Sequence, residues 1–140
     1  MTGIPYRTEY DETYVKQLLA ALTDLGAKTS ILTGVSLSDG QTGAMGYDSR
    51  TQEYFIYQND RIPAQYHGTG DIFSSVTVGG LLRGLSRQDA IHLAADYTAK
   101  TIDVTRMNPK KPWYGVDFEA TIPELVRDLE RLANGSHRLR

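Results

Sequence analysis

The chain has 140 residues, of which 40% are hydrophobic, so it is long enough to form one domain around a buried core. Fifteen basic and seventeen acidic side chains give a net charge of -2, which argues against nucleic acid and anionic lipid as partners. The chain contains no cysteine, which excludes disulfides and cysteine-ligated metals. No apolar segment approaches the roughly 20 residues of a membrane span, and no signal-peptide pattern opens the chain, so we expect a cytoplasmic protein.

The first 60 residues predict a helix, a strand and a β-hairpin, in that order. Apolar residues recur at helical spacing over residues 11–25, with Asp11 placed to cap the helix and Gly26 to end it. Residues 29–35 (TSILTGV) are rich in β-branched side chains and predict a buried strand of a parallel sheet. The segments TGAMGYDS and EYFIYQND, separated by the polar SRTQ, predict a hairpin.

The remainder of the chain predicts three helices and one long loop. Residues 69 to about 83 form a helix that needs tertiary support, because Gly79 and Gly80 are poor helix formers. Ser86 begins a helix over residues 86–103, and residues 105–120 form the longest irregular stretch. The last helix, residues 122–133, follows a capping box of Thr121 and Glu124, and the tail after it is expected to fray. Its apolar stripe is expected to be buried: Ile122, Leu125, Val126, Leu129 and Leu132.

The segment HGTGDIFSS, residues 67–75, carries the candidate chemistry. A glycine-rich turn that enters a helix presents backbone N–H groups and the positive end of the helix dipole, both of which favour an anion. Gly68 and Gly70 allow a close approach to this backbone, and Asp71 adds one carboxylate. Two interpretations remain: Asp71 or Thr69 caps the helix, or Asp71 is a general base beside a bound phosphate. The segment lacks the lysine of a P-loop and the third glycine of a dinucleotide-binding fingerprint.

The segment GTGDIFSS followed by VTVGGLLRGLSRQDAI resembles the C-terminal signature of the ribokinase-like kinases, most closely the pyridoxal/pyridoxamine (pyridoxine) kinases. The order of helix, ILTGV strand, hairpin and glycine-rich helix start is also similar to that family over nearly the whole chain. The resemblance implies the C-terminal half of a three-layer α/β/α fold. It also implies a mostly parallel sheet with a β-hairpin at one edge, within a single domain over residues 1–140.

The resemblance further implies ATP-dependent phosphorylation of the hydroxymethyl group of a B6 vitamer: pyridoxal, pyridoxamine or pyridoxine. By that resemblance Asp71 is the catalytic base, and the backbone of the turn forms the anion hole and phosphate site through Gly68, Thr69 and Gly70. The same comparison implies that ATP is the co-substrate and that Mg²⁺ takes part.

Two further segments match nucleotide-binding positions of the family. Thr33 and Gly34 correspond to the strand end that lines the ATP site, although Gly34 stands where some relatives carry a hydroxyl side chain. The loop beside the nucleotide base corresponds to Met107, Asn108 and Pro109. For this loop, a solvent-facing turn anchored by Trp113 is the alternative interpretation.

Kinases of this family are considerably longer than 140 residues, and the resemblance covers their C-terminal portion. We therefore expect the N-terminal half, with the Mg²⁺ ligands and most of the vitamin pocket, to be absent and the isolated chain to be inactive. The sheet edge exposed in this way predicts self-association or a homodimer. His67, His92 and His137 lack metal-ligand spacing, so no metal site is expected within the chain.

Three functions stay open at this point. The first is a B6 vitamer kinase or the related hydroxymethylpyrimidine kinase, which shares the glycine motif. The second is another ribokinase-like kinase of sugars or nucleosides, which the form of HGTGDIFSS disfavours. The third is a non-catalytic, self-associating α/β module whose glycine turn binds an anion without turnover.

Overall fold

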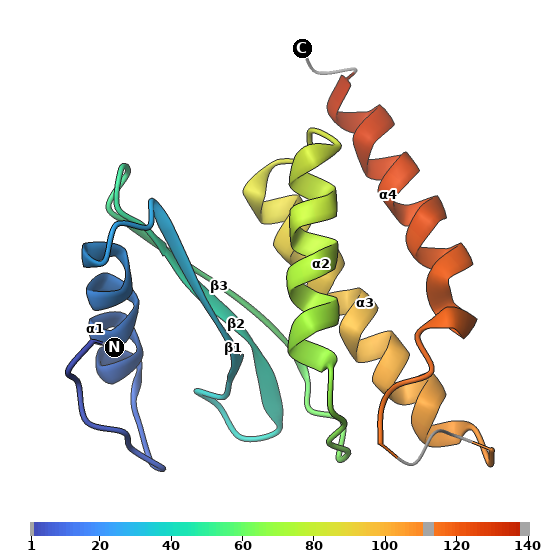
Figure 1. The fold of residues 1–140 in the computed structure, drawn as a ribbon, viewed down its shortest axis with the longest axis horizontal. Coiled ribbons are helices and arrows are strands. Elements are labelled where there is room, and N and C mark those ends of the chain that lie inside the picture. The colour runs from blue at the N-terminus through green and yellow to red at the C-terminus, as the bar shows by residue number, and fades with distance from the viewer. Residues whose placement is uncertain (1, 111–113, 138–140) are drawn as a thin grey trace. The chain divides into compact units, whose positions relative to one another are not determined.

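The computed structural model describes residues 2–110 and 114–137 (Figure 1). The chain divides into two compact units, Met1–Arg61 and Ile62–Arg140. The single domain expected over residues 1–140 stays a prediction. No helix in the described part of the chain is long and apolar enough to cross a membrane.

The first unit begins with helix α1, Glu12–Asp24. Asp11 is its N-cap, as predicted, and its carboxylate accepts a hydrogen bond of 2.8 Å from the backbone N–H of Tyr14. Gly26 follows the helix with a φ of +111°, a backbone conformation that favours glycine, so the helix ends where the sequence predicts.

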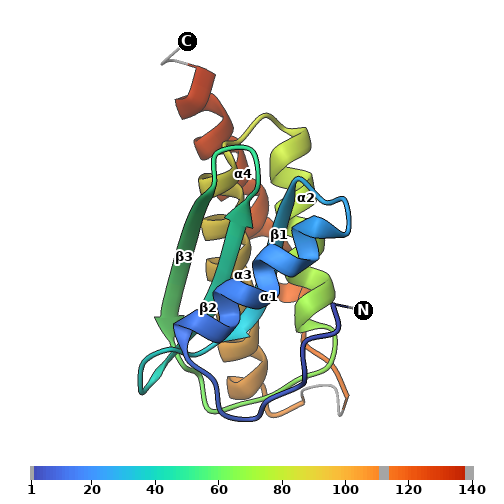
Figure 2. The same cartoon turned by 90° about the vertical axis from the view of Figure 1, so that its left-hand side faces the viewer.

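Three strands follow: β1, Thr29–Val35; β2, Gln41–Asp48; and β3, Glu53–Asp60. They form one sheet in the order β1-β2-β3, with both pairs antiparallel. Helix α1 packs across this sheet (Figure 2), and the core between them contains Val15, Leu19, Val35 and Met45. This buried apolar cluster holds the first unit together.

The strand positions confirm the prediction, but the pairing of β1 differs from the expected parallel arrangement. Only residues 36–40 connect β1 to β2. A parallel pair needs a crossover of a dozen or more residues, so a connection of this length forces an antiparallel pair. In the described part of the chain, the sheet is therefore antiparallel throughout.

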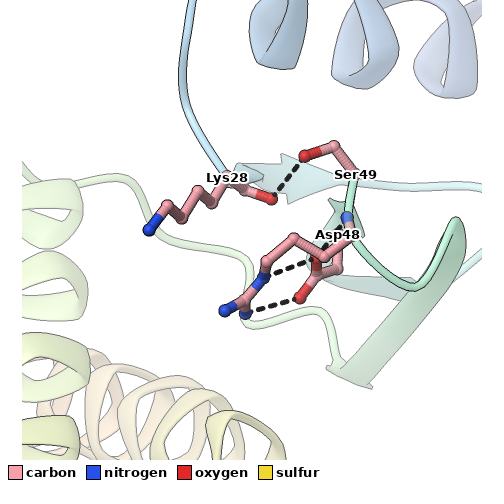
Figure 3. A network of polar contacts seen from close by, with 4 residues as sticks. Lys28, Asp48 and Ser49 are labelled. Atoms are coloured by element: carbon pink, nitrogen blue, oxygen red, sulfur yellow. Dashed lines mark hydrogen bonds and ion pairs between the residues drawn. The ribbon is translucent and has the colours of Figure 1, made fainter.

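The turn between β2 and β3 is fixed by a polar network (Figure 3). Asp48, whose side chain is 1% exposed, accepts hydrogen bonds from the backbone N–H of Arg50 at 2.8 Å and from its guanidinium at 3.0 and 3.3 Å. Ser49 donates from both its hydroxyl and its N–H to the carbonyl oxygen of Lys28, at 3.1 and 3.0 Å. These bonds tie the hairpin turn to the start of β1.

The second unit contains helices α2, Thr69–Leu82; α3, Arg87–Met107; and α4, Ile122–His137, with a short 3₁₀ helix, Glu119–Thr121, before α4. Helix α3 packs against both α2 and α4 (Figure 1). A Cβ at Gly80 would lie 3.1 Å from the Cβ of Ala90. Glycine therefore allows the close approach of α2 to α3 that supports this poorly helical sequence.

Two helices differ from their predicted form. Helix α3 continues to Met107, so the irregular stretch begins at Asn108, and α4 continues through His137 rather than ending at residue 133. The stripe on α4 was expected to be buried, but Ile122 and Val126 are 40% and 47% exposed. Helix α4 meets α3 along one side of that stripe, and Leu125 lies on that side. A hydrophobic stripe therefore predicts the helix here but not how much of it is covered.

Candidate functional site

The 68–71 turn, which opens α2, is the centre of the candidate site. Gly68 is the N-cap of α2, with φ of +84° and ψ of −3°, and no side chain caps the helix. The capping interpretation of Asp71 or Thr69 is therefore wrong. The Thr69 hydroxyl instead donates a long hydrogen bond of 3.4 Å to the carbonyl oxygen of Tyr66.

The backbone of this turn offers several donors in one place. The first hydrogen bond within α2 runs from the N–H of Ile72 to the carbonyl oxygen of Gly68, at 3.0 Å. The N–H groups of the three preceding helical residues, 69–71, therefore have no partner within the helix. A Cβ built at Gly68 or at Gly70 meets no atom within 4 Å. The donors thus lie at a helix N-terminus beside two open positions, an arrangement suited to an anion.

Asp71 places a carboxylate on the same helical turn. It is the third residue of α2 and is exposed. The positive end of the helix dipole favours a carboxylate at this position. One turn therefore combines backbone donors for an anion with a group that accepts a proton.

The loop after α3 lies beside this turn. Gly115 forms an isolated parallel β-bridge with His67, the residue directly before Gly68. Asn108 braces the same loop: its amide donates to the Asp117 carboxylate at 2.9 Å, and its side-chain oxygen accepts from the N–H of Lys110 at 2.9 Å. The loop predicted to contact a nucleotide base and the glycine turn therefore belong to one unit and are linked by backbone pairing.

The other predicted nucleotide-binding residues have different surroundings. Met107 is the last residue of α3 and is 72% exposed, and Pro109 is exposed in the loop. Trp113, the predicted anchor of that loop, lies outside the described residues. Thr33 and Gly34 are exposed and belong to the first unit.

Gly34 interrupts β1 at the end that was predicted to line the ATP site. Its φ is +72°, and the pairing of β1 with β2 is irregular between Thr33 and Val35. The Tyr10 hydroxyl donates to the carbonyl oxygen of Gly34 at 3.5 Å and accepts from the N–H of Ser36 at 3.2 Å. The glycine at this position therefore has a conformational reason, which a hydroxyl-bearing residue would not satisfy.

The sequence interpretation missed a row of buried polar groups on α3. Thr105 accepts a hydrogen bond of 2.9 Å from the N–H of Asp117, and the Tyr97 hydroxyl donates to the carbonyl oxygen of Phe118 at 3.0 Å. Between them, the hydroxyl of Thr101 lies 2.9 Å from that of Thr121. The available signal was the spacing of Tyr97, Thr101 and Thr105, which places three polar groups on one face of a helix.

A cleft of about 360 Å³ lies between α3 and α4, and none of its lining residues belongs to the 68–71 turn. Its charged residues include the ion pairs Lys100–Glu124, at 3.9 Å, and Asp128–Arg131, at 3.0 Å. In the described part of the chain, no group of three or more His, Asp or Glu side chains is arranged to hold a metal ion. The candidate chemistry of this unit is therefore concentrated at the start of α2.

Comparison with known proteins gives three findings. A family model described as phosphomethylpyrimidine kinase matches residues 1–116. None of the curated protein sequences compared with the chain matches it. Solved structures of kinases, in contrast, superpose well on the chain.

A protein of Bacteroides thetaiotaomicron VPI-5482 described as a phosphomethylpyrimidine kinase gives a TM-score of 0.78 at 28% identity, over 86% of this chain and 42% of that chain. Its crystal form with pyridoxal gives 0.75 at 27% identity, over 90% and 43%. Pyridoxal kinase from Lactobacillus plantarum gives 0.74 at 24% identity, over 90% and 45%. These matches confirm the α/β, ribokinase-like fold class, and the chain spans less than half the length of these proteins.

Proposed function

The chain belongs to the phosphomethylpyrimidine kinase family, and from this membership we propose that it supplies the phosphate-binding turn and the general base of a small-molecule kinase. The reaction is transfer of the γ-phosphoryl group of ATP to a hydroxymethyl group. The observation that carries the proposal is the 68–71 turn, where N–H groups without a partner in their own helix and the carboxylate of Asp71 share one exposed turn.

The proposed chemistry assigns one task to each part of the turn. The substrate hydroxyl oxygen attacks the γ-phosphorus, its proton passes to the Asp71 carboxylate, and the bond to the β,γ-bridging oxygen breaks to release ADP. The backbone N–H groups of residues 69–71 stabilise the negative charge on the transferring phosphoryl oxygens. Gly68 supplies the left-handed conformation that this turn requires. The hydroxyl of Thr69, the first residue of α2, is proposed to contact a phosphate oxygen in place of its long hydrogen bond to Tyr66.

The nucleotide itself is proposed to contact the exposed end of α3 through Met107 and Pro109. Because both ends of the Asn108 side chain are already hydrogen-bonded, we expect Asn108 to shape this loop rather than to bind the base through its amide. Thr33 and Gly34 remain proposed contacts of ATP in the first unit.

The substrate is proposed to be a B6 vitamer, such as pyridoxal. Support comes from the Bacteroides relative, which was crystallised with pyridoxal and shares 27% identity with the chain. A hydroxymethylpyrimidine is the second candidate, because it carries the same hydroxymethyl group and because the family model bears a pyrimidine kinase description. Both substrates use the same turn, so the two proposals differ only in the ring that is recognised.

Mg²⁺ accompanies ATP in phosphoryl transfer by neutralising charge on the phosphates. The residues described in this chain do not fit a complete metal site, because they form no group of three or more candidate ligands. No step proposed here is therefore assigned to a metal ligand of this chain. The role of these residues is to bind phosphate and to accept a proton.

The decisive experiment replaces Asp71 by Asn, in the chain together with any segments that complete a kinase of this family. ADP formation with pyridoxal or with hydroxymethylpyrimidine is measured beside ATP affinity. The proposal expects turnover to fall by at least about 100-fold, which is the size of a general-base contribution, with little change in ATP affinity. Glu12→Gln is the matched control, because Glu12 is also an acidic residue in the first turn of a helix.

Two results would contradict the proposal. Unchanged turnover of Asp71→Asn would remove Asp71 from the chemistry. The non-catalytic anion-binding module would instead be supported by two observations together. The unsubstituted protein would bind phosphate without any ATP-dependent turnover, and Asp71→Asn would bind phosphate equally well or more tightly.

A further inference from the structure

We propose that Thr105 is a positioning residue for the 68–71 turn and that it acts through the segment formed by residues 115–118. This inference rests on the proposed function, because it concerns how the turn that binds phosphate is held in place. Thr105 lies on α3, and its hydroxyl contacts two backbone groups, one in its own helix and one in the 115–118 segment.

The Thr105 hydroxyl uses both of its hydrogen-bonding capacities. Its side chain is fully buried and donates to the carbonyl oxygen of Thr101 at 2.7 Å, one turn earlier in the helix. Because the single hydroxyl proton is committed there, a lone pair is left to accept the N–H of Asp117, at 2.9 Å. The helix thereby fixes the backbone of the 115–118 segment at a buried, directional contact.

The other side of this segment pairs with the residue directly before the turn. Gly115, two residues before Asp117, forms the parallel β-bridge with His67. His67 is followed by Gly68, the N-cap of α2, and no side chain caps this helix. The bridge is therefore a restraint on the turn from outside α2, and a shift at Asp117 is transmitted to Gly68 through only a few backbone bonds.

A second contact holds the far end of the segment. The carbonyl oxygen of Phe118 accepts hydrogen bonds from the Tyr97 hydroxyl, at 3.0 Å, and from the Thr121 hydroxyl, at 2.9 Å. Loss of the Thr105 hydroxyl leaves the Phe118 end attached and removes the buried acceptor of the Asp117 N–H, while the Asn108 amide still holds the Asp117 carboxylate at 2.9 Å. Removal of the Thr105 hydroxyl therefore tests how the turn is positioned while residues 115–118 stay attached to α3 through Phe118.

The informative substitution is Thr105→Val, which keeps the branched shape and removes the hydroxyl. The Asp117 N–H then lacks its acceptor, and an unpaired donor of this kind favours a shift of the segment toward water. We expect phosphate binding at the 68–71 turn to weaken at least about fivefold, the effect of one lost hydrogen bond. Hydrogen exchange of the Ile72 N–H, which is bonded to Gly68, should accelerate by a similar factor.

The experiment titrates the ¹⁵N-labelled chain with inorganic phosphate and follows the amide signals of residues 67–72. Thr105→Ser, which keeps the hydroxyl, should bind phosphate within about twofold of the unsubstituted chain. Thr98→Val is the matched control, because the Thr98 hydroxyl lies on the same helix and commits its proton to the carbonyl oxygen of Ala94, at 2.7 Å, and not to the 115–118 segment. It should lose a comparable bond without any effect on the turn.

The inference is overturned if Thr105→Val and Thr98→Val give the same phosphate affinity and the same exchange rates across the turn. Failure of the unsubstituted chain to bind phosphate would contradict the proposed function, whereas the exchange rates would still decide the positioning role, because they need no ligand. If Thr105→Val does not fold, Thr105→Ala provides the same comparison, since it removes the same acceptor without a branched side chain.

Discussion

Replacement of Gly70 by alanine separates the stability of α2 from anion binding. Gly70 is the second residue of α2 and has no positive φ, so alanine can adopt its backbone conformation. A Cβ at this position meets no atom within 4 Å. Alanine lowers the conformational entropy of the unfolded chain, so the free energy of unfolding should stay the same or rise by up to about 1 kcal/mol.

The same methyl group should weaken phosphate binding. Every Cα–Cβ bond in a helix tilts toward the helix N-terminus, which is where the N–H donors of residues 69–71 lie. A methyl group there would keep a phosphate from at least one charge-assisted hydrogen bond, worth about 1.5–3 kcal/mol. That loss corresponds to a reduction in affinity of about tenfold or more.

The assay combines urea unfolding with a phosphate titration followed at the amide signals of the turn. Stability that is unchanged or increased, together with weaker binding, would show that glycine at position 70 serves the ligand. Unchanged phosphate affinity in Gly70→Ala would refute this reasoning, because the open space beside Gly70 would then have no part in binding. Loss of stability would refute the assumption that the position is unstrained.

Three further substitutions test other parts of the structure. Gly68→Ala should lower the free energy of unfolding by about 1–2 kcal/mol and weaken phosphate binding. Gly84, also at positive φ and in open space, is the control: Gly84→Ala should cost the same stability and leave phosphate binding unchanged. Urea unfolding measures the stability, and the phosphate titration measures the binding. Leu19→Ala should destabilise the chain by about 2–5 kcal/mol in urea, because the side chain is completely buried against the sheet; a loss below 1 kcal/mol would contradict that packing. Arg50→Met should cost about 1–2 kcal/mol, because it removes the guanidinium from the buried carboxylate of Asp48, and an unchanged unfolding midpoint would show that water replaces the guanidinium.

Most elements of the fold could be predicted because local signals determine them. Asp11 and Ser86 cap their helices through their own side chains, and the strands coincide with their β-branched or alternating segments. The predicted parallel direction of β1 is wrong, because a buried apolar strand has the same composition in a parallel pair and in an antiparallel pair. The short connection at residues 36–40 carried the missing information.

Exposure of Ile122 and Val126 could not be predicted for a related reason. Their spacing defines an apolar face on α4, but how much of that face is covered depends on which side of α3 meets it. The buried hydroxyl of Thr105 was missed because threonine within a helix indicates only a weak helix former when it is considered alone. Its partner, Asp117, lies 12 residues away in the sequence, beyond the reach of local patterns.

The candidate site depends both on local sequence and on contacts between residues that are distant in the sequence. The donors of the 68–71 turn follow from local sequence, because a helix that begins after Gly68 leaves its first N–H groups without a partner in the helix. The placement of the turn depends on the bridge from Gly115 to His67 and therefore on contacts made by α3. Substitutions at residue 70 should consequently change binding without loss of stability, whereas substitutions at residue 105 should change both. If substitutions at residues 70 and 105 changed stability and phosphate affinity in the same way, the N–H donors of the turn and the α3 contacts that hold it would not be separable.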